Sequence, residues 1–322
     1  MNDVRFCLEI WGTDYEKIKQ TCLLAEDLGC YGFYYGESLT EIDLDCWTVL
    51  STLIPITNKI KLGPVITYIL PDYRSLALLV KQSITFQDIS NGRLELRTGA
   101  GASLEYSIQW WYPFGINYSG ASIRVALFKE GIQLLSKLLG NSDMNYSQSR
   151  SSISIANFEG KFFKIPGASF VKPKIRIPIT IAAKQDRMMK IAANYGDVWE
   201  CSYLSPDEFF TLNERFERLS KKVGNIDVSE KPQIRVVEKS IELDVIIGSN
   251  ELELDYKKKV FAMERGPGIY NQLLKKGLVG NPDEIRSRIQ EYVNLGINQF
   301  FLAFQDPFDL NSIELFMDAV QS

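Results

Sequence analysis

The stretch that decides the fold is Asp88-Ile89-Ser90-Asn91-Gly92-Arg93-Leu94-Glu95-Leu96-Arg97-Thr98-Gly99-Ala100-Gly101. It predicts a helix end, a turn through Ser-Asn-Gly, a short strand with apolar residues at Leu94 and Leu96, and a glycine-broken loop. A strand ending in Gly-x-Gly leaves backbone room at its carboxyl end, where α/β folds bind ligands. A tight helix–strand–loop connection in any α/β enzyme would share this local pattern. Whether the stretch marks a ligand-binding strand end therefore has to be inferred from the rest of the chain.

The same alternation of helix and strand continues on both sides of this stretch. Eight apolar segments predict strands, and helical patterns with apolar residues three or four positions apart lie between them. The predicted strands are Val4–Ile10, Tyr31–Tyr35, Lys59–Thr67, Leu94–Thr98, Ile177–Ala182, Gly196–Cys201, Gln233–Leu243 and Asn298–Phe304. The predicted helices are one from Asp14 and those over Leu44–Ile54, Arg74–Ile89, Ala121–Leu139, Gln185–Tyr195, Pro206–Val223, Leu252–Lys276, Asn281–Leu295 and Leu310–Val320.

Strands separated by helices run parallel, because each crossover returns the chain to the same end of the sheet. Eight such units predict a parallel, eight-stranded (β/α)8 TIM barrel with surface insertions, formed by residues 1–322 as one domain. A doubly wound open sheet is the alternative. It is less favoured because neither a Gly-x-Gly-x-x-Gly turn after the first strand nor a P-loop is present. The serine-rich stretch Asn141–Ser154 is interpreted as a surface excursion.

The composition of the chain restricts the kinds of molecule that the protein is expected to bind. The apolar fraction of 45% and the charged fraction of 24% are typical of a soluble globular protein. A net charge of −4 argues against nucleic acid, and no apolar run is long enough to suggest a membrane span. The five cysteines are scattered without a Cys-x-x-Cys spacing, so we expect reduced thiols and a cytoplasmic protein.

The 322 residues include no histidine. This excludes Ser-His and Cys-His dyads, imidazole acid–base catalysis and the common histidine-containing zinc sites, so no metal site is predicted. Chemistry in this chain must use Asp, Glu, Tyr, Lys or Cys, or a cofactor that carries its own reactivity. A chain without catalytic activity is the other interpretation.

Several motifs, in order along nearly the whole chain, resemble the bacterial-luciferase-like superfamily of flavin monooxygenases and deazaflavin (F420)-dependent oxidoreductases. They are Gly36-Glu37, Leu62-Gly63-Pro64, Ser90-Asn91-Gly92-Arg93, Gly99-Ala100-Gly101, Pro178 through Ala183, Tyr195-Gly196-Asp197, Leu278 through Glu284, and Gly296-Ile297. Gly63-Pro64-Val65-Ile66-Thr67 with Arg74-Ser75 is most similar to the methylenetetrahydromethanopterin reductase branch.

The resemblance implies that F420 or FMN lies over the carboxyl ends of the strands. A non-proline cis peptide behind the ring, common in the family, would fall at Val65–Ile66. The phosphate is expected at the start of a helix, where backbone N–H groups point outward. The residues implied in cofactor binding are Val65, Ile66, Thr67, Thr98, Gly99, Ala100, Gly101, Ala182, Ala183, Lys184 and Gln185.

The chain departs from the family pattern in its acid–base residues. Where many relatives have an acid followed by histidine, this chain has Glu37-Ser38, and Ala102 replaces an acid that follows the Gly-x-Gly region in the deazaflavin dehydrogenases. Glu37 with Ser38 is therefore the expected catalytic pair, and Glu200 is the second choice of acid. A carboxyl in an apolar pocket is favoured in its neutral form, so it can donate a proton.

An aromatic cluster follows the fourth strand, formed by Tyr106, Trp110, Trp111, Tyr112 and Phe114. We interpret it as a loop that stacks on a flat ligand or, alternatively, as a dimer contact.

The leading hypothesis is an oxidoreductase that uses F420 or FMN for hydride transfer to a small or pterin-like substrate. An FMN-dependent monooxygenase and a catalytically silent flavin-binding protein are the alternatives, along with a barrel that binds no flavin. A homodimer is expected.

Overall fold

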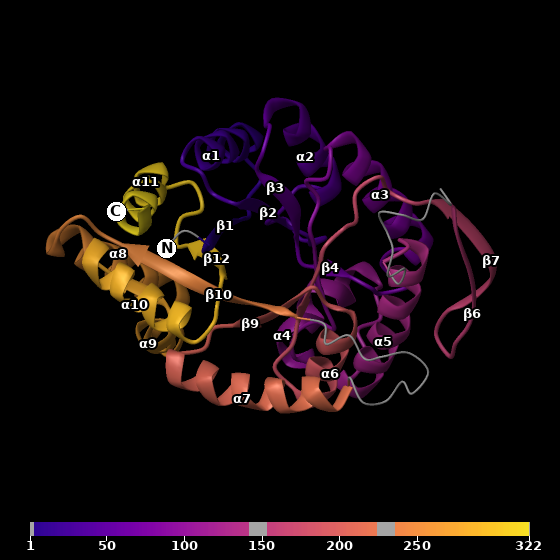
Figure 1. Ribbon diagram of the computed structural model, residues 1–322. Coiled ribbons are helices and arrows are strands. Elements are labelled where there is room, and N and C mark those ends of the chain that lie inside the picture. Colours follow the sequence, from indigo (N-terminus) through magenta and orange to yellow (C-terminus); the bar gives the residue numbers. More distant parts are fainter. Residues whose placement is uncertain (1–2, 142–152, 224–235, 322) are drawn as a thin grey trace.

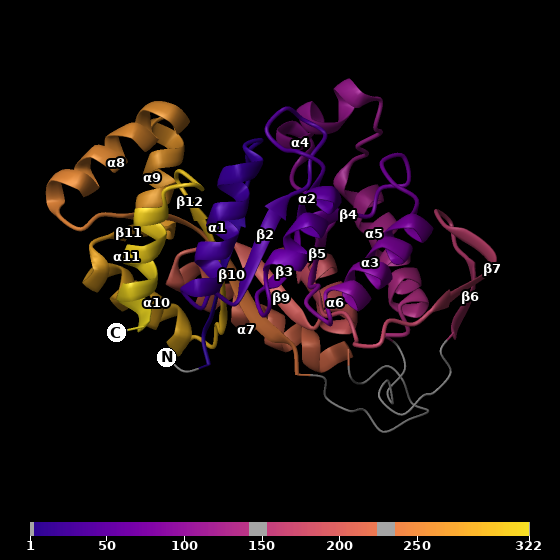
Figure 2. The same ribbon diagram turned by 90° about the horizontal axis from the view of Figure 1, so that it is seen from above.

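The computed structural model describes residues 3–141, 153–223 and 236–321. Its main sheet has ten strands, all pairing in parallel, and curves into a nearly closed barrel surrounded by helices (Figures 1 and 2). The barrel strands are β1 (Arg5–Ile10), β2 (Gly32–Gly36), β3 (Lys61–Val65) with β4 (Thr67–Tyr68), β5 (Leu96–Gly99), β8 (Ile179–Ala182), β9 (Val198–Ser202), β10 (Glu238–Ile247) and β12 (Gln299–Phe304). They correspond one to one to the eight predicted strands, so the predicted barrel is confirmed.

The barrel closes between β3 and β5. The backbone N–H of Leu62 donates to the carbonyl of Arg93 at 2.9 Å, and the N–H of Glu95 donates to that of Leu62 at 3.2 Å. The third barrel strand is interrupted at Ile66: β3 before it pairs with β2, whereas β4 after it pairs with β5. Because of this change of partner, the third barrel strand pairs with β2 along its first part and with β5 at its end, and so it links the two edges of the sheet.

The helices pack outside the strands, and the ends of several of them follow from local sequence. They are α1 (Tyr15–Asp27), α2 (Cys46–Leu53), α3 (Leu76–Ile89), α4 (Leu104–Trp111), α5 (Ala121–Leu138), α6 (Asp186–Tyr195), α7 (Pro206–Val223), α8 (Glu251–Arg265), α9 (Pro267–Lys276), α10 (Pro282–Asn294) and α11 (Leu310–Gln321), with short 3-10 turns η1 (Ile54–Ile56) and η2 (Tyr112–Phe114). Asp14 caps α1 and Asp45 caps α2, each by accepting the backbone N–H of the third residue of its helix.

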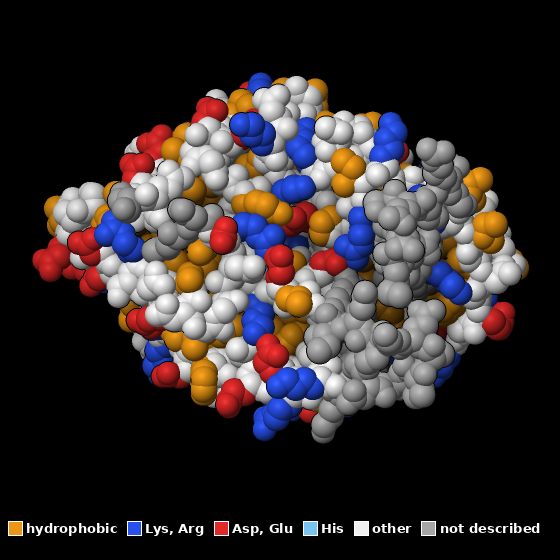
Figure 3. Space-filling model, viewed as in Figure 1, with side chains coloured by type: hydrophobic (Ala, Val, Ile, Leu, Met, Phe, Trp, Pro, Cys, Tyr) orange, Lys and Arg blue, Asp and Glu red, His pale blue; other side chains and the backbone are white. Residues whose placement is uncertain are grey.

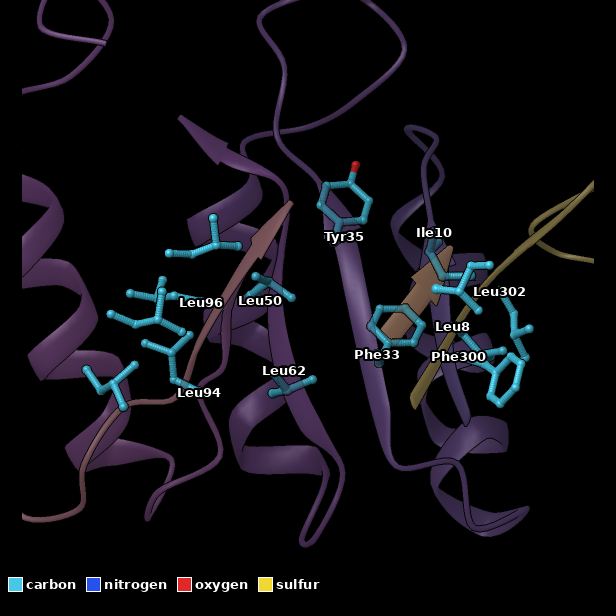
Figure 4. Close-up of a cluster of buried hydrophobic side chains, with 14 of the residues drawn as sticks. Leu8, Ile10, Phe33, Tyr35, Leu50, Leu62, Leu94, Leu96, Phe300 and Leu302 are labelled. Carbon is cyan, nitrogen blue, oxygen red and sulfur yellow. The ribbon is translucent and has the colours of Figure 1, made fainter. Parts of the chain in front are cut away.

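The main hydrophobic core lies between the strands and the helices. Alternate strand residues point outward into it, among them Leu8, Phe33, Leu62, Leu96 and Phe300 (Figure 4). Because side chains alternate along a strand, the residues between them point into the barrel, and many of these are polar. The barrel interior therefore holds charge, whereas the layer around it is apolar.

Several segments differ from the sequence-based prediction. A hairpin of β6 (Ile153–Glu159) and β7 (Lys164–Val171) forms a separate two-stranded sheet beside α5, and its largely exposed strands gave no core pattern. The expected surface excursion Asn141–Ser154 falls mostly outside the described residues, as do residues 233–235 of the seventh predicted strand. The helical stretch Leu252–Lys276 divides at Gly266, whose φ of 82° an L-residue rarely adopts.

Two further differences concern the helix α4 and the short strand β11. The expected aromatic loop after the fourth strand is instead α4 followed by η2, because Ser103 caps α4 by accepting the N–H of Tyr106. The short strand β11 (Leu278–Gly280), which was not predicted, pairs with β10.

The distribution of charged side chains can be followed on one face of the molecule. Acidic and basic side chains are interspersed on the face shown in Figure 3. Within residues 3–141, 153–223 and 236–321, no helix is both long and apolar enough to cross a membrane, and no cluster of potential ligands is arranged to hold a metal ion.

Candidate active site

The predicted site residues line one arc of the barrel mouth at the carboxyl ends of the strands. Neighbouring strands place Gly36 beside Val65, Thr67 beside Thr98, and Gly99 beside both Tyr68 and Ala182. Glu37 follows Gly36 directly, and its N–H donates to the carbonyl of Val65 at 3.0 Å. The structure therefore brings Glu37 and Gly99 to the same end of the barrel, 62 positions apart in sequence.

The expected cis peptide at Val65–Ile66 is wrong, because no cis bond occurs in the described part of the chain. A non-proline cis bond costs about 3–4 kcal/mol. Here the strand changes partner at Ile66 with trans geometry throughout: Val65 accepts from Glu37 on one side, and Thr98 Oγ1 donates to the carbonyl of Thr67 at 2.8 Å on the other. The partly exposed side chains of Val65 and Ile66 lie at this break.

Glu37 is buried, with 4% of its surface exposed, and it is paired. Its Oε1 accepts from Arg74 Nη2 at 2.5 Å and from the Tyr73 hydroxyl at 3.1 Å. Arg74 Nη2 also donates to Thr67 Oγ1 at 2.6 Å. Burial raises the pKa of Glu37, and the Arg74 charge opposes that rise. Glu37 is thus a carboxyl whose proton affinity is set by two opposing influences.

The structural role of Ser38 differs from that of Glu37. Its hydroxyl donates to Asp43 Oδ2 at 2.8 Å, so it ties together the loop between β2 and α2. A Cβ on Gly36 would lie 2.7 Å from Asp43 Oδ1, which means that glycine is needed there for the loop to fold back. The Tyr35 hydroxyl donates to the Gly12 carbonyl at 2.6 Å and accepts the N–H of Leu44, which holds the loop against β1.

The glycine loop after β5 is arranged for close approach. A Cβ on Gly99 would lie 3.3 Å from both Ile66 Cδ1 and Ala182 Cβ, so any side chain there would crowd the mouth. Gly101 has φ of 80°, and a Cβ on it would lie 2.1 Å from the Tyr118 hydroxyl oxygen. The Ala100 carbonyl accepts from Arg124 Nε at 2.9 Å, which fixes the course of the loop.

The loop between β8 and α6 lies next along the mouth. Ala183 is held on both sides, since its N–H donates to the Glu200 carbonyl at 2.9 Å and its carbonyl accepts from Trp199 Nε1 at 2.7 Å. Lys184 is exposed, and its Nζ donates to the Ser202 carbonyl at 3.2 Å. Gln185 is the N-cap residue of α6 and makes no side-chain capping bond, so the first-turn amides remain available to an anion.

The barrel interior beneath the mouth holds a charged cluster that sequence reasoning did not assemble. Arg97 is fully buried: its Nε donates to Glu200 Oε2 at 2.7 Å, its Nη2 to Glu242 Oε2 at 3.3 Å, and its Nη1 to Glu9. The guanidinium also lies 3.7 Å from the Phe301 ring centroid. Glu200, the second choice of acid, is therefore one of three carboxyl groups on a single arginine.

Burial raises the pKa of Glu9 well above its usual range. Arg97 opposes this rise, and Glu242 and Glu200 add to it. The sequence contained one signal for this cluster, the alternation of inward and outward side chains along a strand. Inward positions of their strands are occupied by Glu9, Arg97, Glu200 and Glu242. Which strands face each other across the barrel could not be derived from alternation alone.

Part of the aromatic cluster lies against the site. The Trp111 ring centroid is 4.7 Å from that of Tyr68 and 5.1 Å from that of Tyr73, so α4 packs on the residues that surround Glu37. In contrast, Tyr106, Tyr112 and Phe114 are exposed. The structure therefore divides the predicted cluster into a buried inner part and an exposed outer part.

Comparison with known proteins places this architecture in a family. The sequence profile described as luciferase-like monooxygenase matches residues 9–240, more than half of the chain. The chain belongs to the luciferase-like monooxygenase family. Family members pair a TIM barrel with flavin or F420 chemistry, and both the predicted family and the predicted fold class are confirmed.

Within this family, one curated relative is a 5,10-methylenetetrahydromethanopterin reductase of Archaeoglobus fulgidus, 26% identical over 210 residues. The aligned part covers 65% of this chain and only 56% of that relative.

Solved structures of the family share the fold along nearly the whole chain. An F420-dependent secondary alcohol dehydrogenase, in complex with an F420-acetone adduct, superposes with a TM-score of 0.77 at 15% identity, covering 99% of this chain and 100% of its own. A coenzyme F420-dependent tetrahydromethanopterin reductase from Methanopyrus kandleri gives 0.73 at 18%, covering 99% of each chain. A long-chain alkane monooxygenase gives 0.75 at 16%, covering 100% of this chain and 92% of its own.

Proposed function

We propose that this chain is an oxidoreductase that binds F420, or FMN as the second choice, in the barrel mouth and catalyses hydride transfer to a small or pterin-like acceptor. The observation that carries this proposal is the continuous arc from Glu37 through Thr67 and Gly99 to Ala182, which has little side-chain volume at its centre. F420 is preferred to FMN because the curated relative is a methylenetetrahydromethanopterin reductase and two of the structural neighbours use F420.

The residues present fit a flat ring with a phosphate-bearing tail. Gly99 presents bare backbone between Ile66 Cδ1 and Ala182 Cβ, and the partly exposed Val65 provides an apolar surface at the strand break. The backbone on the same side of the mouth would be provided by Thr67, Thr98, Ala100 and Gly101.

The tail would be held by the start of α6, together with Ala183, Lys184 and Gln185. Lys184 is exposed and adds a cation beside the first-turn amides. Asp186, in the first turn, would repel an anion. However, its Oδ1 lies 2.5 Å from Arg215 Nε, which offsets its charge.

A bound reduced deazaflavin supplies the hydride, so the chain's own residues have to position the acceptor, exclude water and supply a proton. Glu37 has a raised pKa and lies at the mouth, which suits a proton donor. Arg74 and Tyr73 fix the direction of its carboxyl group, and Ser38 holds the neighbouring loop.

We further propose that residues 1–322 act as one domain, that the protein forms a homodimer, and that it works in the cytoplasm. The five buried, unpaired cysteines are consistent with a reducing compartment. Light scattering tests the dimer directly.

Titration of the purified protein with F420 and with FMN, read by fluorescence quenching, tests cofactor binding. We expect saturable binding of F420 and weaker binding of FMN. Oxidation of reduced F420 in the presence of an acceptor then distinguishes an enzyme from a silent binder. Binding of neither cofactor would contradict the proposal.

A further inference from the structure

Helix α8 exposes a row of large hydrophobic side chains at one edge of the molecule (Figures 1 and 2). Leu252, Tyr256 and Met263 are 84%, 68% and 86% exposed. Their spacings of four and seven residues place them along one side of the helix, because an α-helix has about 3.6 residues per turn. We call these three residues the α8 stripe. By contrast, α10 exposes no large hydrophobic side chain between Pro282 and Asn294, a range described in full.

The α8 stripe does not help to attach α8 to the barrel, because the opposite side of the helix does so. There, Leu254 and Phe261 are buried in a small core with Ile246 of β10 and Leu273 of α9. A surface helix of a monomer normally has one hydrophobic side, whereas α8 has two. The second side therefore indicates contact with another molecule.

A network of polar contacts also holds α8 in a fixed position. Lys257 Nζ donates to Ser312 Oγ at 2.6 Å and lies 3.1 Å from Asp309 Oδ2, both at the start of α11. The same amino group lies 2.7 Å from Glu253 Oε1 on α8 itself. The stripe is thus presented by a helix that is fastened to its neighbours, so little order has to be gained when a partner docks.

Two charges beside the stripe have no partner within the described residues. The ion pairs found for α8, over Glu251–Arg265, are both made by Lys257. Asp255 and Lys259 are exposed and unpaired. Helical geometry places both on the same flank of the stripe, with the acid one turn before the base.

We propose that α8 is an interface between two copies of this chain, in which the two α8 helices pack antiparallel about a two-fold axis near the middle of the helix. Leu252 of each copy then lies opposite Met263 of the other, and Tyr256 lies close to the axis. A two-fold axis repeats every contact, so a self-complementary surface is needed.

The two charges decide both the partner and its direction. Antiparallel packing brings Asp255 of each copy beside Lys259 of the other, which forms two opposite-charge pairs across the interface. Parallel packing would place Asp255 against Asp255 and Lys259 against Lys259. The macrodipoles of the two helices are also favourably opposed only in the antiparallel arrangement.

This inference deepens one part of the proposed function, the homodimer, by naming its interface. It rests on that homodimer and does not depend on a bound cofactor. Its tests therefore measure association of the full chain alone.

Met263→Glu tests the stripe. Each dimer would contain the substitution twice, so we expect the Kd for dimerisation to rise at least about tenfold in sedimentation equilibrium. Ile155→Glu is the matched control, because Ile155 is a 70% exposed hydrophobic residue on β6, on the other side of the barrel from α8 (Figure 1). Circular dichroism checks that both variants fold. A monomeric wild-type chain, or equal Kd values in the two variants, would overturn the proposal.

Reversal of the two charges tests the direction of packing. Asp255→Lys and Lys259→Asp should each raise the Kd about tenfold, because each places like charges together twice. The double variant should recover the wild-type Kd, since it restores the opposite-charge pairs in reversed order. Failure of the double variant to recover would overturn antiparallel packing.

These results separate the interface from the rest of the proposed function. A dimer that persists unchanged in all four variants would leave the homodimer standing and place its interface away from α8. A protein that binds neither F420 nor FMN, yet loses dimerisation with Met263→Glu and recovers it in the double charge reversal, would contradict the proposed oxidoreductase and confirm the α8 interface.

Discussion

Arg74 reaches back to Glu37 along the rim of the barrel mouth, with Nη2 and Oε1 separated by 2.5 Å. The guanidinium carbon of Arg74 also lies 5.5 Å from the Trp47 ring centroid and 5.4 Å from that of Tyr73. Two elements adjacent in the barrel, the end of β2 and the segment before α3, are thus joined at the point where the acceptor is expected. Because Glu37 is buried, its negative charge is stabilised by the Arg74 guanidinium, with hydrogen bonds from Thr67 and Tyr73 adding to the effect.

Glu37→Gln should lower turnover about a hundredfold and change cofactor affinity little, because an amide keeps the shape but cannot donate a proton as an acid does. Steady-state kinetics with reduced F420, alongside cofactor titration, measure the two effects. Glu251→Gln, at an exposed position on α8, is the control. A change below threefold would assign Glu37 a structural role.

Gly99→Val should weaken cofactor binding about tenfold or more, equivalent to about 1.4 kcal/mol. The Cβ alone would already lie 3.3 Å from Ile66 Cδ1 and Ala182 Cβ, and the added methyl groups would enter the mouth. Fluorescence titration measures the affinity, and circular dichroism checks the fold. Gly268→Val is the control, since a Cβ there meets nothing within 4 Å. Equal affinity in the two variants would remove Gly99 from the site.

Arg97→Met should destabilise the fold by about 3–5 kcal/mol, because it leaves the buried Glu9 and Glu200 and the partly buried Glu242 without their cation. The loss should grow as pH rises, since ionised carboxylates are then harder to bury. Urea unfolding at several pH values gives the free energies. Adding Glu200→Gln to the variant should recover part of the loss. Stability close to wild type at every pH would show that the cluster is already neutral without Arg97.

Asp244 should make the free energy of unfolding depend on pH. Its pKa is raised to about 7 in the folded chain from 3.8, so the folded state binds a proton that the unfolded state has lost. The associated stability is full below pH 3.8 and is lost as pH rises through about 7. Asp244→Asn should flatten this decline. Asp255→Asn, at an exposed position on α8, should retain it, and urea midpoints at about pH 5 and about pH 8 compare the variants.

The eight-stranded barrel could be predicted from the sequence because its signal is local. Apolar segments such as Ile177–Ala182 alternate with helical patterns such as Pro206–Val223, and parallel pairing follows from the crossovers. Helix α7 has the predicted bounds, and β12 begins one residue after its predicted start. The hairpin β6–β7 escaped prediction because most of its side chains are exposed, so no core periodicity marked it.

The sequence by itself also determined that Glu37, Gly99 and Ala182 lie at the same end of the barrel, because each follows or ends a predicted strand. Tertiary structure decided what each of them contacts. Arg97 meets Glu9, Glu200 and Glu242 from three other strands, up to 145 positions away. The backbone N–H of Tyr203 donates to the Glu242 carbonyl only because β9 and β10 are neighbours. Periodicity fixes which way a side chain points, whereas the closure of the barrel fixes which charges share its interior.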